Sequence, residues 1–359
     1  MKKYLVVLSF IFSVLFLSAQ NNFAQGAEKK AAKYHEWWNE RFPGAPMQFK
    51  DAKMLPLIKV RGNQFVNAGG DTVIFHGLAI ADPGKLVNEG HWSKEIFEKA
   101  KQLGTMIIRI PVHPISWREV TPEKYLMLLD QAVVWCTGLG MYIDIDWHSI
   151  GNLEEGLFQD PMYVTSLTET YNFWRTIAEH FQGINTICFY ELFNEPTDYR
   201  GRLGNASWHD WKKINENLIK LIRAYDPDKI PLVAGFDWAY DLTPLNMEPI
   251  DAEGIGYSVH PYPHKRTPPY EPKWEEDFGF AANKYPVVAT ELGFTMPDSA
   301  VNFTYGKAIM NYFKEKKMSW IWWCFDPQWG PTMFDSWKTY KLTNNGIFYK
   351  EAAQGEIGK

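Results

Sequence analysis

Eight short apolar segments alternate with helical or polar stretches between residues 72 and 325, and this alternation limits the possible folds more than any other feature. Helical patterns lie between them, such as one that Thr121-Pro122 opens and Gly138 closes. Near-continuous apolar strands separated by helices predict a parallel sheet covered on both faces. The eight predicted strands are residues 72–78, 105–111, 141–147, 186–193, 230–235, 254–260, 286–291 and 319–325.

Eight such units within about 250–300 residues favour a closed barrel over an open sheet. The competing fold, a doubly wound nucleotide-binding sheet, would carry a glycine-rich turn after its first strand. Residues 76–84 contain no GxGxxG, and the sequence contains no GxxxxGK[ST]. A hairpin pattern at 58–66 precedes the first strand. We therefore predict an α/β fold, a (β/α)8 TIM barrel with a short N-terminal β-hairpin.

Composition excludes some partners and favours others. The formal net charge is -5 and no long basic run occurs, so we expect no nucleic-acid partner. The 16 Trp residues exceed what a core needs and suit a surface that stacks flat, apolar ligand faces. The three Cys lie far apart in apolar segments, which favours buried thiols over a disulfide, and no CxxC occurs to support a zinc site.

Polar residues occur at the ends of most predicted strands. In a (β/α)8 barrel the reactive groups lie at the C-terminal ends of the strands, so these residues are expected on one rim. Strand five contributes less clearly, through Asp237 and Trp238. The others are Arg109, Asp146, His148, Asn194, Glu195, His260, Tyr262, Glu291, Trp322 and Trp323.

Two of these residues, Glu195 and Glu291, come from strands on opposite sides of the barrel mouth. Two facing carboxylates in a Trp-rich cleft are the groups that glycoside hydrolysis requires. Either Glu alone could instead form a buried ion pair with no catalytic role. The presence of both together favours glycoside hydrolysis. Glu191 is predicted to share a strand face with Phe193 and Glu195 but to lie about 13 Å deeper than Glu195, at about 3.3 Å per residue, as a structural residue that is paired or hydrogen-bonded there.

Seven short motifs resemble, in the same order, those of glycoside hydrolase family five, in the clan of (β/α)8 retaining glycosidases. The resemblance covers about residues 55–350. The motifs are HGL after the first strand, RIPV at 109–112, DWH at 146–148, NEP at 194–196, HPY at 260–262, TELG at 290–293 and the strand-eight Trp cluster.

The resemblance implies roles for the residues around the two carboxylates. Glu195 matches the acid/base and Glu291 the nucleophile. Arg109 matches the Arg beneath the nucleophile, and Tyr262 the Tyr that donates a hydrogen bond to it. Asn194 matches the Asn that holds the sugar 2-hydroxyl.

The resemblance also implies which residues line the cleaved subsite. His148 and His260 match the histidines of that subsite, and Trp323 matches the platform beneath the sugar ring, with Trp322 as the alternative. The implied substrate is a β-linked polysaccharide or oligosaccharide, first of all β-1,4-glucan cleaved internally, as by a cellulase. A β-mannanase, a xyloglucanase, a mixed-linkage glucanase and an exo-glucanase stay open.

The predicted reaction is a double displacement with retention, because two inward-facing Glu on an eight-stranded rim should approach closely. It requires no metal or organic cofactor, and we expect a monomer. A metal-dependent barrel hydrolase using Asp144, Asp146, His148 and His260 is a remote alternative: the usual HxH of its first strand is missing, and a chelator would distinguish the two. A non-catalytic carbohydrate-binding protein is disfavoured because both Glu are present.

The domain organisation follows from the N-terminal sequence. Lys2 and Lys3 precede an apolar run at 4–17 and a small-residue site at 18–20, which predicts a secretory signal peptide and a secreted or periplasmic protein. The run is too short for a membrane span, so no membrane association is expected after cleavage. We predict a signal peptide at 1–25, an N-terminal lead-in at 26–54 and the catalytic domain at 55–359.

Overall fold

The computed structural model describes residues 36–49, 54–294 and 300–357. The predicted signal peptide and much of the predicted lead-in lie outside these ranges. The chain divides into two compact units at residue 41. In the first, the described residues hold one short 3-10 helix, Trp37–Asn39. The second, residues 42–359, contains the barrel.

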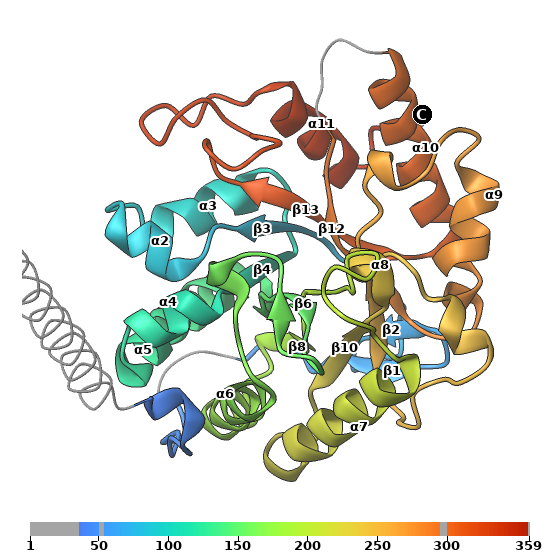
Figure 1. The fold of residues 1–359 in the computed structure, drawn as a ribbon. Coiled ribbons are helices and arrows are strands. Elements are labelled where there is room, and N and C mark those ends of the chain that lie inside the picture. Colours follow the sequence, from blue (N-terminus) through green and yellow to red (C-terminus); the bar gives the residue numbers. More distant parts are fainter. Residues whose placement is uncertain (1–35, 50–53, 295–299, 358–359) are drawn as a thin grey trace, which may run out of the picture. The chain divides into compact units, whose positions relative to one another are not determined.

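Eight parallel strands close into a barrel, which confirms the predicted fold (Figure 1). The boundaries differ by up to two residues except at the first barrel strand, which begins at His76, because Asn67 and Asp71 form a turn that pairs Thr72 with Val66 instead. The strands, in order around the barrel, are β3 (His76–Ile80), β4 (Ile107–Val112), β5 (Tyr142–Trp147), β8 (Ile187–Glu191), β10 (Ile230–Ala234), β11 (Gly256–Val259), β12 (Val287–Leu292) and β13 (Ser319–Phe325).

Helices cover the outside of the barrel, and side-chain caps fix where several begin. Thr121, Ser166 and Ser207 each accept a hydrogen bond from a backbone N–H of the first turn. The helices are α2 (Pro83–Asn88), α3 (Lys94–Gln102), α4 (Pro114–Glu119), α5 (Pro122–Leu139), α6 (Leu167–His180), α7 (Trp208–Tyr225), α9 (Glu271–Trp274), α10 (Ala300–Lys316) and α11 (Asn344–Ala353). The segment labelled α8 (Phe236–Ala239) follows β10 and is a turn with non-helical residues. None within the described ranges is long and apolar enough to cross a membrane.

The predicted hairpin, β1 (Lys59–Arg61) and β2 (Gln64–Val66), plugs the N-terminal end of the barrel. The ring of Phe65 lies 4.7 Å from that of Phe189 and 6.4 Å from that of Phe75, within one buried apolar cluster. This packing leaves the polar groups of the barrel at the opposite, C-terminal end.

A second, small sheet forms beside that end from β6 (Ile150–Asn152), β7 (Leu157–Phe158) and β9 (Glu195–Pro196). The prediction that Glu191, Phe193 and Glu195 share one strand face is therefore wrong. The chain leaves β8 at Glu191, Phe193 packs against Trp211, and Glu195 belongs to β9, where it pairs with Ile150.

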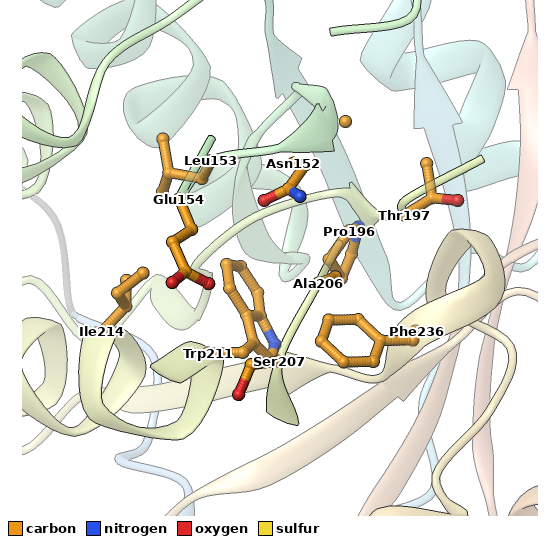
Figure 2. Close-up of a pocket in the computed structure, with 11 residues that line it drawn as sticks. Asn152, Leu153, Glu154, Pro196, Thr197, Ala206, Ser207, Trp211, Ile214 and Phe236 are labelled. Carbon is orange, nitrogen blue, oxygen red and sulfur yellow. The ribbon is translucent and has the colours of Figure 1, made fainter. Parts of the chain in front are cut away.

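A small void lies behind this sheet (Figure 2), where Pro196 and Thr197 face Trp211 and Phe236. It offers about 10 Å³ of space, which is close to the minimum for one water molecule. The void is a packing gap and cannot hold a substrate.

All three cysteines are buried, free thiols, as predicted.

Candidate active site

The structure brings all eight predicted site residues together at the C-terminal end of the barrel. Arg109 lies in β4, His148 directly follows β5, and Asn194 and Glu195 follow β8. His260 and Tyr262 follow β11, Glu291 lies in β12 and Trp323 in β13.

Glu195 and Glu291 each have a carboxylate oxygen within 4.8 Å of the other and of a His260 nitrogen. Retaining glycosidases place their two carboxyl groups about 5–5.5 Å apart, whereas inverting enzymes need roughly 6.5–9.5 Å to admit a water. The short separation that the sequence predicted is thus confirmed. The Glu195 side chain is 13% exposed and that of Glu291 6%, so a ligand can reach both.

Glu291 is held by one donor on each oxygen. Arg109 Nη1 donates to Oε1 at 2.7 Å, and the Tyr262 hydroxyl donates to Oε2 at 2.9 Å. Burial, Glu291 and Glu195 raise the pKa of Tyr262 well above its ordinary value, so the phenol keeps its proton. The two donors fix the orientation of the Glu291 carboxylate, which a nucleophile needs for attack.

Glu195 is instead paired with an imidazole. His260 Nδ1 lies 2.9 Å from Glu195 Oε1. Burial alone would lower the pKa of His260, but the carboxylates of Glu291, Glu191 and Glu195 outweigh it and raise the pKa to about 9. A proton is therefore stored beside Glu195 at neutral pH.

Arg109 is fully buried and organises the floor of the site. Besides Glu291, its guanidinium contacts Glu191 Oε2 at 2.6 Å, Asn194 Oδ1 at 2.7 Å and Asp146 Oδ2 at 2.9 Å. Arginine is only a donor, so the Asn194 oxygen must face it. The Asn194 Nδ2 group is buried and has no partner among the described residues, which leaves it able to donate to a ligand hydroxyl.

An aromatic wall lines one side of the cleft. The rings of His148 and Trp323 are parallel, 5.3 Å apart at 3°, and Trp329 stacks on Trp323 at 5.7 Å. His148 Nδ1 contacts Asp146 Oδ2 at 2.6 Å, while burial and nearby cationic groups hold the pKa of His148 well below its ordinary value. Trp322, the alternative platform, is fully buried against Phe294 and cannot meet a ligand.

On the Glu195 side lies a pocket of about 520 Å³. Trp238 is held there by three contacts: its Nε1 donates to Gln159 Oε1 at 2.7 Å, Lys265 Nζ lies 4.6 Å above its ring, and the Tyr199 ring meets it edge-on at 5.2 Å. Asp237 and Trp238, less clearly predicted from sequence, thus line the site beside the acid/base candidate.

Sequence reasoning missed two residues, Thr290 and His113. Thr290 shares the strand face of Val288, which belongs to the buried cluster inside the barrel, and contacts both Glu191 and His260. The register between β12 and β13 shifts between Ala289 and Leu292, and the adjacent Glu291 reaches the site as well. His113 lies 4.4 Å from the His148 ring and contacts Asp82 Oδ2 at 3.2 Å; its place directly after β4 was the available signal.

The metal-hydrolase alternative gains no support from the geometry. His76 begins β3, so it lies at the end of the barrel away from the mouth. Asp146 is engaged by Arg109 and His148. The described His, Cys, Asp and Glu residues whose possible ligand atoms converge are Glu195, His260 and Glu291, the predicted catalytic pair and its imidazole.

Residues 66–328 match the model of the family described as Cellulase (glycosyl hydrolase family 5). Among curated proteins, an endoglucanase of Clostridium saccharobutylicum is 23% identical over 83% of this chain and 65% of its own length. Endoglucanase E-5 of Thermobifida fusca is 27% identical over 57% of this chain and 42% of its own length. The chain therefore spans about 42–65% of the length of these relatives.

A solved structure matches over more of the chain. The β-glucanase SdGluc5_26A of Saccharophagus degradans is 43% identical, with a TM-score of 0.85 over 89% of this chain and 99% of that one. A second structure of that β-glucanase, in complex with cellotetraose, has a TM-score of 0.84 at 42% identity.

Proposed function

The chain belongs to glycosyl hydrolase family 5, and we propose that it is an endo-acting, retaining β-glucanase that cleaves β-1,4-linked glucan. The observation that carries the proposal is the pair Glu195 and Glu291, whose oxygens lie within 4.8 Å at the mouth of the barrel. The names of the relatives, endoglucanases and a β-glucanase with bound cellotetraose, support the choice of substrate.

In the first step Glu195 donates a proton to the glycosidic oxygen while Glu291 attacks the anomeric carbon. The C–O bond to the leaving sugar breaks and a covalent glycosyl–Glu291 ester forms. Arg109 and Tyr262 hold Glu291 in the orientation for this attack. Water then gives a proton to Glu195 and attacks the anomeric carbon, whose bond to the Glu291 oxygen breaks. This second inversion restores the original configuration and frees the Glu291 carboxylate.

Internal cleavage is supported by surfaces on both sides of the carboxylate pair. Trp323 and Trp329 offer flat aromatic faces on one side, and the Trp238 pocket lies beside Glu195, where the leaving sugars must go. Export belongs to the same proposal, because a polysaccharide is cleaved outside the cytoplasm; the basic and then apolar residues 1–17 support it. Sequencing the N-terminus of the exported protein tests that part.

The test is a panel of soluble β-1,4-glucan, mixed-linkage β-glucan, β-mannan and xyloglucan. We expect the viscosity of a β-glucan solution to fall steeply while few reducing ends have formed. Release of one short oligosaccharide without a fall in viscosity would contradict endo-action. Proton NMR of the first product should show the β-anomer; an initial α-anomer would exclude the double displacement.

A further inference from the structure

Glu191 is buried below the two catalytic carboxylates, and its own carboxylate joins their two hydrogen-bond networks. Its Oε2 accepts from Arg109 Nε at 2.6 Å, and its Oε1 accepts from the Thr290 hydroxyl at 2.7 Å. Arg109 continues to Glu291. Thr290 continues to His260, which lies beside Glu195. Glu191 is thus paired and hydrogen-bonded, as the sequence predicted, and it also connects the two catalytic carboxylates.

The direction of each hydrogen bond follows from the chemistry of the groups. An ionised carboxylate only accepts, so the single proton of the Thr290 hydroxyl points at Glu191. The Thr290 oxygen, 3.1 Å from His260 Nε2, must then accept from that nitrogen. Nε2 therefore carries a proton in either charge state of the imidazole. The proton that can move is the one between Nδ1 and Glu195 Oε1, which are 2.9 Å apart.

We propose that Glu191 and Thr290 are positioning residues for the acid/base: they fix the tautomer of His260 so that its Nδ1 exchanges a proton with Glu195, and they set the pH above which Glu195 has no proton to give. This inference rests on the proposed function, since it assigns Glu195 as the acid.

The charges around the imidazole agree with this role. Glu195 on β9, Glu191 on β8 and Glu291 on β12 face His260 at 2.9, 3.5 and 3.7 Å. Asp144 and His148 act on it from β5 and from the residue after β5. Burial opposes the charged form, but the carboxylates outweigh it and raise the pKa of His260 to about 9. The pair of His260 and Glu195 therefore loses its shared proton only in alkaline solution.

The test compares Thr290→Val, which removes the hydroxyl and keeps the shape, with Thr290→Ser, which keeps the hydroxyl. Without the Thr290 oxygen as an acceptor for its Nε2–H, the charged form of His260 is stabilised less, so its pKa falls. For Thr290→Val we expect the basic limb of kcat/KM on soluble β-glucan to move down by about one pH unit, and Thr290→Ser to restore it. Thr105→Val is the matched control, because Thr105 also loses one buried hydroxyl contact, to Tyr349 at 2.8 Å, away from the site.

An aryl glycoside with a good leaving group needs no acid in its first step, so its kcat/KM should change less than about twofold in Thr290→Val. A basic limb that stays in place in Thr290→Val, or an equal loss on both substrates, would overturn the proposal.

A second measurement on the unaltered protein needs no substrate and no variant. Nitrogen-15 NMR of the histidine side chains should show that His260 keeps its Nε2 proton through its alkaline titration. A neutral His260 with its proton on Nδ1 would overturn the proposal even if every glucan is cleaved. Absence of glucan cleavage with the expected tautomer would instead refute the proposed function alone.

Discussion

Glu195 and Glu291 are close neighbours with different partners, and the difference predicts different mutant behaviour. Glu291 is bound by a guanidinium and a phenol, while Glu195 is bound by an imidazole. We expect Glu291→Ala to lose activity and azide to restore it with inverted product, because the anion replaces the nucleophile. Glu195→Ala should keep activity on aryl glycosides with good leaving groups, which need no acid.

Kinetics with both kinds of substrate, with and without azide, check this assignment. If the two variants exchange these behaviours, the roles of Glu195 and Glu291 are reversed. Equal and mild losses in both would remove the glycosidase mechanism from this site.

Replacing Glu191 should also lower the free energy of unfolding by an amount that can be measured. Both Glu191 and Arg109 are fully buried, and Glu191→Gln leaves the guanidinium without the charge that faces its Nε. Breaking one side of a buried pair costs about 3–5 kcal/mol. Urea unfolding should show a loss of this size, while the folded fraction keeps a measurable turnover.

Glu169→Gln is the matched control, because Glu169 is equally buried and pairs with Arg118 outside the site. It should lose less stability, because the Arg118 side chain is 22% exposed and can be hydrated, and its pH–rate profile should be unchanged. A Glu191→Gln protein that is as stable as wild type but inactive would show that Glu191 takes part in the chemistry itself.

At the scale of elements, the segment after β10 is unusual because three consecutive residues other than glycine are left-handed. Asp237, Trp238 and Ala239 have φ of 55, 58 and 55°. Each costs about 1–2 kcal/mol, so the surrounding structure must hold the turn. One brace is the His260 N–H, which donates to the Ala239 carbonyl at 2.7 Å. Such strain clusters at ligand sites, and here it presents Trp238 to the leaving-group pocket.

We expect Trp238→Ala to lower kcat/KM on soluble β-glucan about tenfold, since an aromatic stacking contact contributes about 0.5–1.5 kcal/mol. An aryl glycoside with no sugar in this pocket should be hydrolysed as before. Trp92→Ala is the control, because Trp92 also donates its Nε1 to a glutamine, Gln131, at 2.7 Å, on the helical surface. Equal effects of the two variants on glucan would contradict a binding role for Trp238.

The elements also show what a sequence can and cannot predict. Apolar strands and capped helices have local sequence patterns, so the barrel and its polar rim could be predicted from the sequence. Two features could not: that the adjacent Thr290 and Glu291 both reach the site, and that the strand breaks between Glu191 and Glu195. Both depend on how neighbouring strands pair, because β12 shifts register beside β13 and Glu195 pairs with β6 instead of continuing β8. The choice of Trp323 over Trp322 likewise required the packing of Phe294 against Trp322.

In the whole barrel, the apolar plug that stabilises the fold and the residues of the active site lie at opposite ends. Phe65 is only 3% exposed and packs into the plug against Phe189. Phe65→Ala should cost about 3–5 kcal/mol, as do other buried Phe truncations. Thermal unfolding should show a lower Tm, with kcat of the folded enzyme unchanged. Met247→Ala, at a residue 89% exposed, should leave both unchanged. A fall in kcat at constant Tm would mean that the plug and the site are coupled.

The plug has a consequence for how this chain can diversify. Because the apolar cluster around Phe65 closes one end of the barrel, the loops at the other end can be exchanged without unpacking it. Segments such as 197–207 and 263–270, which help to line the pocket beside Glu195, are therefore natural sites for transplantation from other barrels. A library that varies them on a constant scaffold should yield enzymes with new glycan preferences at nearly constant melting temperature.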